Sequence, residues 1–310
     1  MQEPDRPEEV AAYNERSLST LARAITLSEG HFALILVRCN YEICSWQMMQ
    51  RLQKLTKVPL SRLVLPKSSP ALFPTILSAS ANEQTLALVV VGLESVVELD
   101  RLLISTNQVR DEFRKSLAFP LVLWVTDEVL QKLTRFAPDF KSWAATSIKF
   151  ELATNQLLAL WHQAADRLFT KILESGVEEF LPNNAIDLAP GCRRRQEVEA
   201  ALRDLKARNI RLESTLVATW KFILGRDAFS QDRIDVAFNL YQQSLDCWRQ
   251  ELEAQDESTE NEEAQTPSSN AGNLSINRSV PPHLPLLASA SSTNSERYGV
   301  VLQHIGWCYC

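Results

Sequence analysis

Three short runs of consecutive apolar residues constrain the fold of this chain most strongly. They occupy residues 31–38 (HFALILVR), 85–92 (TLALVVVG) and 119–126 (FPLVLWVT). Runs of this length without polar alternation are typical of strands that are buried on both faces, as in a parallel sheet covered by helices. Segments with helical spacing of apolar residues separate the runs. This alternation predicts an α/β domain of three layers around a parallel sheet.

Shorter signals complete the predicted domain. Residues 61–65 (SRLVL) and 145–152 (ATSIKFEL) are expected to form a short strand and an edge strand. The expected helices cover residues 8–27, 42–57, 69–79, 95–115 and 127–136. The helix at 42–57 is predicted from apolar residues that step by three, which are Ile43, Trp46, Met49, Leu52 and Leu55.

Composition divides the chain into five parts. The α/β domain is expected to span residues 1–152, because the strand signals end there, and a helical connector with a loop follows over 153–192. A long helix and a helical hairpin are predicted for 193–250. Residues 251–295 are rich in Glu, Ser, Asn and Pro and cannot bury enough apolar area to offset the entropy of ordering, so they are expected to be a disordered insert. One more helix is predicted at 296–310.

The hairpin has the small and bulky residues of a tetratricopeptide repeat (TPR), a pair of antiparallel helices. The matching residues in 216–249 are Leu224, Gly225, Ala237, Tyr241 and Ser244. Ala237 falls twelve residues after Gly225, where the two helices cross and only a small side chain fits. Trp220 lies one residue away from the usual place of the early Trp. A plain helical hairpin is the alternative interpretation.

The last residues repeat part of this pattern. Leu302, Ile305 and Tyr309 are large, and Gly306 is small, as in the first helix of a TPR. We expect a truncated repeat here, in a natural protein that continues beyond Cys310. Because a single repeat buries its face only against neighbours, such a chain is expected to be a platform for other proteins.

The predicted long helix carries a heptad seam over about three heptads from residue 193 to 216. Its positions are Val198, Leu202, Leu205, Asn209, Leu212 and Leu216. One interpretation is a parallel homodimer with Asn209 at an a position of the heptad. The other is packing within the chain against the first repeat, which we favour because three heptads are marginally stable alone.

The segment after the first strand lacks the features of a phosphate-binding loop. Such a loop needs glycines, whose backbone N–H groups approach the phosphates, together with a Lys and a Ser or Thr. Residues 38–45 (RCNYEICS) contain neither Gly nor Lys, and Glu42 would repel a phosphate. Glu94, after the strand at 85–92, is the one candidate ligand for Mg²⁺, but such a Glu usually begins a helix. We expect no catalytic, cofactor-binding or metal-binding residue, no cofactor and no enzymatic activity.

Residues 15–152 resemble the N-terminal region of bacterial, cyanobacterial-type TPR proteins. The similar stretches are 24–40, 88–95 (LVVVGLES) and 120–143 (PLVLWVTDEVLQKLTRFAPDFKSW). The resemblance implies a STAND-type, P-loop-NTPase-like domain without its phosphate loop, and an adaptor role in signalling or assembly. Ser142 and Trp143 would line a vestigial cleft, although a turn and a core residue are the favoured interpretation.

Three functions therefore remain open at this point. The first is a non-catalytic scaffold that binds other proteins through its TPR-like helices. The second is a nucleotide-responsive switch, and the third is a dimeric coiled-coil structural protein. The sequence does not identify which residues would bind a partner.

Net charge, the N-terminal residues and the spacing of cysteines and histidines limit the expected binding partners and the expected cellular location of the protein. The formal net charge of −6 gives no basic excess for nucleic acid or membrane surfaces, and the run Arg193–Arg195 is interpreted as a solvated helix start. The N-terminal residues lack the apolar stretch of a signal peptide, so a cytoplasmic location is expected. The six cysteines form no CxxC motif and the four histidines are scattered, which argues against a metal site.

Overall fold

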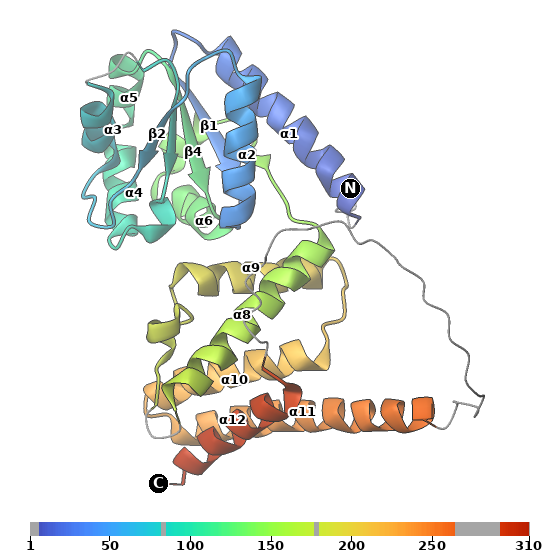
Figure 1. Ribbon diagram of the computed structural model, residues 1–310. Helices are drawn as coiled ribbons and strands as arrows, with labels where there is room; N and C mark the ends of the chain where they lie inside the picture. Colours follow the sequence, from blue (N-terminus) through green and yellow to red (C-terminus); the bar gives the residue numbers. More distant parts are fainter. Residues whose placement is uncertain (1–5, 82–84, 177–179, 264–291, 310) are drawn as a thin grey trace, which may run out of the picture. The chain divides into compact units, whose positions relative to one another are not determined.

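A computed structural model describes most of the chain (Figure 1). The described residues are 6–81, 85–176, 180–263 and 292–309. The chain divides into two compact units, of which the first contains residues 1–158 and 199–204 and the second contains 159–198 and 205–310. The first unit is an α/β domain and the second is helical.

The first unit is built on one parallel sheet of five strands in the order β2-β3-β4-β1-β5. The strands are β1 (Ala33–Arg38), β2 (Ser61–Val64), β3 (Leu88–Val91), β4 (Pro120–Val125) and β5 (Ile148–Lys149). All six residues of β4 are buried, because this strand pairs with β1 on one side and β3 on the other. The α/β class predicted from the apolar runs is confirmed.

Helices cover both faces of the sheet. They are α1 (Pro7–Leu27), α2 (Glu42–Leu55), α3 (Leu72–Ser80), α4 (Leu99–Gln108), α5 (Arg110–Ser116), α6 (Asp127–Phe136) and α7 (Pro138–Ser142), with a 3₁₀ turn η1 (Leu93–Ser95). Helix α1 packs on α2, whereas α4 packs on α3, α6 and α7. Figure 1 shows α1 and α2 on one side of the sheet and α3, α4 and α5 on the other. The single helix expected at 95–115 is therefore η1 followed by two helices.

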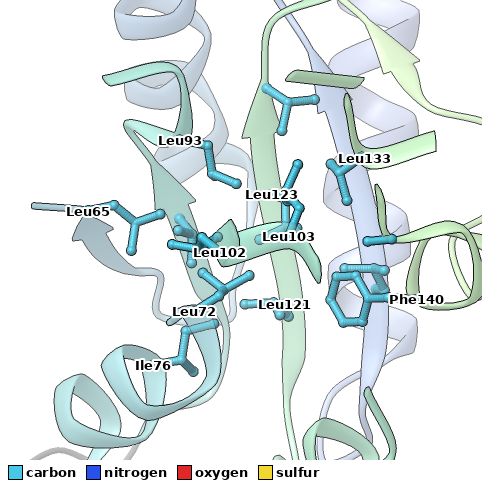
Figure 2. Packing of buried hydrophobic residues seen from close by; sticks show 14 of the residues in the cluster. Leu65, Leu72, Ile76, Leu93, Leu102, Leu103, Leu121, Leu123, Leu133 and Phe140 are labelled. Atoms are coloured by element: carbon cyan, nitrogen blue, oxygen red, sulfur yellow. The ribbon is translucent and has the colours of Figure 1, made fainter. Parts of the chain in front are cut away.

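The larger core lies between the sheet and helices α3, α4, α6 and α7. Figure 2 shows side chains from these helices converging on Leu121 and Leu123 of β4. The labelled members of the cluster are Leu65, Leu72, Ile76, Leu93, Leu102, Leu103, Leu121, Leu123, Leu133 and Phe140. Leu121 and Leu123 are both 0% exposed, so these helices fix the position of the central strand.

Helix α2 buries only two of the five apolar residues whose spacing predicted it, Met49 and Leu52. The structure buries Cys44, Met48, Met49 and Leu52 of this helix. Ile43, Trp46 and Leu55 are instead 54%, 56% and 52% exposed. Each residue of an α-helix turns by about 100°, so residues that step by three drift around the axis and cannot all share one face.

The second unit contains helices and one 3₁₀ turn in its described part. They are α8 (Thr154–Ser175), which begins in the first unit, η2 (Asn183–Ile186), α9 (Arg193–Ala207), whose residues 199–204 belong to the first unit, α10 (Ser214–Ser230), α11 (Ile234–Glu263) and α12 (Asn294–Trp307). Helices α10 and α11 form the expected hairpin, and α12 packs on α11. Figure 1 shows α11 projecting well past the start of α12.

The continuous helix predicted for 193–216 is wrong. Helix α9 ends at Ala207, and Asn209 has a left-handed φ of 57°. The N–H of Ile210 donates to the carbonyl of Leu205, which closes the helix end, and Asn is one of the few residues that accept this conformation. Leu216 belongs to α10, so the heptad seam, and the dimer seam built on it, are not carried by one helix.

The predicted insert at 251–295 also needs correction at both ends. Helix α11 continues to Glu263, and α12 begins at Asn294 with Thr293 and Glu296 forming a capping box. Residues 251–263 contain neither Gly nor Pro, so an existing helix propagates through them. The remainder of the predicted insert, residues 264–291, lies outside the described residues.

The central strand provides a test of the packing. Replacing Leu123 by Ala should lower the free energy of unfolding of the α/β unit by about 2–5 kcal/mol, because the cavity cannot collapse fully. Leu55→Ala, at a half-exposed site of α2, should cost less than about 1 kcal/mol. Urea-dependent hydrogen exchange of peptides from β4 measures both values. Equal losses in the two variants would show that β4 is not the packed centre of the sheet.

Candidate functional site

The first candidate site is the crevice between the carboxyl ends of β1 and β4. From β1 the chain crosses through α2 to the far edge strand β2, whereas from β4 it crosses through α6 in the opposite direction to β5. Right-handed crossovers in opposite directions place α2 and α6 on opposite faces of the sheet. In open α/β sheets, ligands bind at such a switch of direction.

Side chains of this unit link the carboxyl ends of β1 and β4. Only Cys39, Asn40 and Tyr41 lie between β1 and α2. The Asn40 amide donates to Asp127 Oδ2 at 2.9 Å, and its Oδ1 accepts from the Asp127 N–H at 2.9 Å. Arg38 Nε lies 3.0 Å from Asp127 Oδ1, in an ion pair without hydrogen-bond alignment. A three-residue connection is too short to surround a phosphate group.

The charges around the crevice oppose an anion. A helix N-terminus attracts anions through its free N–H groups. At the start of α6, however, the N–H of Asp127 donates to Asn40, and the N–H of Val129 donates to the side chain of Thr126. The first turns of α2 and α6 also carry acidic residues, Glu42 in α2 and Asp127 with Glu128 in α6. Carboxylates therefore lie at the starts of both helices, where an anion would otherwise be favoured.

The residues predicted as candidates for this crevice do not meet there. Glu94 lies in the 3₁₀ turn after β3, and no group of three His, Cys, Asp or Glu residues with metal-binding geometry occurs among the described residues. Trp143 packs edge-on to Phe32, which precedes β1, so it lies near the amino edge of the sheet. Ser142 is exposed and donates to the carbonyl of Asp139. Ser142 is thus the last residue of helix α7 rather than part of a turn, and Trp143 is a partly buried residue packed against the main hydrophobic cluster rather than a fully buried core residue.

Sequence analysis missed Arg38, Asn40 and Asp127 as a group. The available signal was polar residues directly after two buried strands. Their meeting requires β1 and β4 to be neighbours, although Asn40 and Asp127 are 87 positions apart in the chain.

The second candidate site is the α10–α11 hairpin with α12. A Cβ atom on Gly225 would lie 2.5 Å from Tyr241 Cε1, so only glycine admits the ring. The Ser244 hydroxyl donates to the carbonyl of Ala218 at 2.8 Å. Ala237, Tyr241 and Ser244 are 0% exposed. The small and bulky residues singled out in the sequence thus interlock where the two helices cross.

Trp220, which fitted the sequence pattern poorly, faces other partners. The guanidinium of Arg195 lies 4.3 Å from its ring centre, and Trp161 meets it edge-on at 5.8 Å. The basic run Arg193–Arg195 was expected to be a solvated helix start, and Arg195 is its last residue. Arg195 is instead 3% exposed and pairs with Asp227 at 3.0 Å, so the prediction is wrong for this residue.

A buried polar network ties the loop before α9 to α10 and α12. Arg226 is 0% exposed and donates to the carbonyl of Leu181, to Asn183 Oδ1 at 2.8 Å and to His304 Nε2 at 2.5 Å. Asn183 donates in turn to Asp227 Oδ1 at 2.7 Å. Because a buried polar group without a partner is costly, this network specifies one arrangement of the three segments.

The network shifts two pKa values. Burial lowers the pKa of Arg226 to about 10, so the side chain stays charged at neutral pH. Burial, and then the positive charge of Arg226, lower the pKa of His304 to about 3. Since Arg226 only donates, His304 Nε2 accepts and Nδ1 donates to the carbonyl of Val300 at 2.9 Å.

Comparisons with known proteins do not assign the chain to a family. A search with the whole chain finds no matching protein-family model and no significantly similar curated protein. Among the described residues, no helix combines the length and apolar character needed to cross a membrane.

The bonds between Asn40 and Asp127 lead to a first prediction for this site. Asn40→Ala should lower the free energy of unfolding of the α/β unit by about 1–3 kcal/mol, because it removes the acceptor of the Asp127 N–H and the donor to Asp127 Oδ2. Gln53→Ala, at an exposed position of α2, should change it by less than about 0.5 kcal/mol. Hydrogen exchange in urea compares the two. An unaffected Asn40 variant would mean that water replaces the side chain.

Two glycines on helices should respond with opposite signs. Gly225→Ala should destabilise the hairpin by about 1–3 kcal/mol, since Tyr241 must move. Gly306→Ala should stabilise α12 by up to about 1 kcal/mol, because no atom of the described residues lies within 4 Å of its Cβ position and Ala favours helix more than Gly does. Hydrogen exchange of peptides from α10, α11 and α12 measures both changes. Stabilisation by Gly225→Ala would contradict the interlock.

The neutral His304 predicts a pH dependence of the helical unit. Its folded pKa lies below the unfolded value of about 6.5, so its contribution to stability is complete above that pH and is lost as the pH falls toward 3. Two ionisable side chains contact the His304 ring: Arg226 is hydrogen-bonded to its Nε2, and the Tyr241 ring packs edge-on against it. Between pH 6.5 and 4.5 the wild type should lose about 2 kcal/mol more than His304→Gln, as measured by urea unfolding. Parallel losses in both proteins would argue against a buried, neutral ring.

Proposed function

We propose that this chain is a non-catalytic scaffold that binds other proteins through its helical unit. The observation that carries the proposal is the interlock of Gly225 with Tyr241, which supports the interpretation of α10 and α11 as a TPR-like pair. Repeats of this kind stack into surfaces that bind polypeptides. The proposed setting is the bacterial cytoplasm, on the strength of sequence resemblance.

The α/β unit supports this proposal through its chemistry. We interpret it as a P-loop-NTPase-like domain that has lost phosphate binding, because Asn40 and Asp127 occupy the crevice and acidic residues begin both adjoining helices. The same observations count against the nucleotide-responsive switch. The coiled-coil dimer loses its main argument with the end of α9 at Ala207.

Native mass spectrometry with and without ATP and Mg²⁺ tests the first half of the proposal. The expected mass is that of the polypeptide alone, 35.0 kDa, in both conditions. A retained nucleotide would make the protein a switch and overturn the proposal.

Cross-linked partner capture tests the second half. Partners should be lost with Gly225→Leu, which forces the hairpin apart, and retained with Asn40→Ala, which perturbs only the α/β unit. Hydrogen exchange checks that each variant disturbs the intended unit alone. Retention of every partner by Gly225→Leu would show that the hairpin is not the binding element.

A further inference from the structure

Strand β2 leaves one edge of the parallel sheet unpaired among the described residues. It stands at the end of the strand order and pairs only with β3. The N–H groups of Ser61 and Leu65 donate to carbonyls of the β3 segment. Backbone groups of successive residues point to alternate sides of a strand, so those of Arg62 and Val64 point away from β3. We call Arg62 and Val64 the β2 edge.

The side chains of the β2 edge are exposed as well. Arg62 and Val64 lie on the same face of the strand, because alternate residues share a face. Both are exposed, and Val64 is 57% exposed although it is apolar. Pro66 is the next residue in this alternation and has no N–H, so pairing with a further strand would end there. The edge thus combines free backbone groups with one cationic and one apolar side chain.

Basic residues accompany β2 in the sequence. Residues 43–82 contain neither Asp nor Glu, although the formal net charge of the chain is −6. Their basic residues are Arg51, Lys54, Lys57, Arg62 and Lys67. Arg51 pairs with Glu15 of α1. Lys57, Arg62 and Lys67 are exposed, and none of them has a carboxylate partner within the described part of the chain. Since these three precede, belong to and follow β2, positive charge is spread along its length.

This charge selects among the strands that could pair with β2. An open sheet edge accepts other strands unless charges or prolines prevent it. A second copy of β2 would bring the same basic residues together, and like charges on directly opposed strands are destabilising. An acidic strand would be attracted by the same residues. In recognition by strand addition, backbone hydrogen bonds hold the added strand and its side chains provide the selection.

We propose that the β2 edge binds an extended acidic segment of another protein, which adds a sixth strand to the sheet. Backbone groups of the segment pair with those of Arg62 and Val64. One acidic side chain lies beside Arg62, and an apolar side chain lies beside Val64. The inference goes beyond the proposed function and does not depend on it, because it assigns a second binding surface to the α/β unit.

A short peptide tests the chemistry of the partner. The probe is Ser-Glu-Thr-Val-Thr-Glu-Ser with blocked termini and a fluorescent label, and its residue order is the same in both directions. It should bind the full chain, as measured by fluorescence anisotropy, and binding should weaken with rising salt. Lysines in place of the glutamates should weaken binding about tenfold or more. No binding of the acidic peptide, or equal binding of the lysine peptide, would overturn the proposal.

Methylated peptides separate strand addition from simple attraction between charges. One peptide carries N-methyl groups on its glutamates and valine, and the other carries them on its threonines and its last serine. Alternate amides of an extended chain point to opposite sides, so only one of the two sets can face β2. Strand addition therefore predicts that one peptide binds about tenfold more weakly than the other. Equal binding by both would show that the peptide backbone does not pair with β2, which would overturn the proposal.

Variants of the protein locate the binding. Val64→Pro removes an outward N–H at an edge position, where proline is tolerated, and should weaken binding about tenfold or more. Arg62→Glu should do the same. Arg23→Glu, at an exposed position of α1, changes the net charge equally and should bind like the wild type. Hydrogen exchange of peptides from β4 checks that the α/β unit stays folded. Equal binding by Arg62→Glu and Arg23→Glu would exclude the β2 edge as the site.

Competition and sedimentation separate the other occupants. A single-stranded oligonucleotide that displaces the acidic peptide and binds more tightly would assign the basic residues to nucleic acid and overturn the proposal. Sedimentation velocity should show a monomer, whereas a dimer that Val64→Pro dissociates would assign the edge to a second copy. Failure here is distinct from failure of the proposed function. Partner capture with Gly225→Leu tests the helical hairpin, and its outcome leaves peptide binding at β2 unchanged.

Discussion

Complete burial of β4 is the constraint on which the α/β unit depends. A strand without a polar face requires a paired strand on each side and helices above and below. The chain meets this requirement by inserting β4 between β1 and β3, and the helices that follow β1 and β4 then leave toward opposite faces. The crevice at their carboxyl ends is a geometrical result of covering that strand. The polar groups in this crevice depend instead on the residues that follow the two strands.

The sequence alone predicted which strands are buried, but it did not predict which strands are neighbours in the sheet. The apolar runs predicted the strands because each lacks polar alternation. The spacing of small and bulky residues predicted the α10–α11 hairpin, but not that Tyr241 lies over Gly225. Arg38, Asn40 and Asp127 could not be grouped, since the strand order joins them and no local pattern encodes it. Two further features could not be predicted from the sequence pattern. Ile43 is exposed because residues that step by three rotate gradually around a helix, and α9 ends because Asn209 adopts a left-handed backbone conformation.

The helical unit relies on a different kind of interaction from the sheet. Its apolar contacts would permit several arrangements of helices, but Arg226 has partners on the loop at Leu181 and Asn183 and on α12 at His304. Any arrangement that loses one of them leaves a buried donor unsatisfied. Nothing in the local sequence distinguishes Arg226 from a solvated arginine, so sequence analysis assigned it no role. The role of a buried hydrogen-bond network such as that of Arg226 can be recognised only from the tertiary structure.

The bonds between Asn40 and Asp127 also set a threshold for any ligand of the α/β unit. A molecule that enters the crevice must first bind a minor state in which these two bonds are broken. If opening costs about 3 kcal/mol, that state is populated about 0.6% of the time, and the observed affinity falls about 150-fold below the intrinsic one. A ligand of ordinary micromolar strength would then bind in the range of about 0.1 mM. Asn40 and Asp127 therefore stabilise the fold and, by binding each other, also compete with any ligand of the crevice.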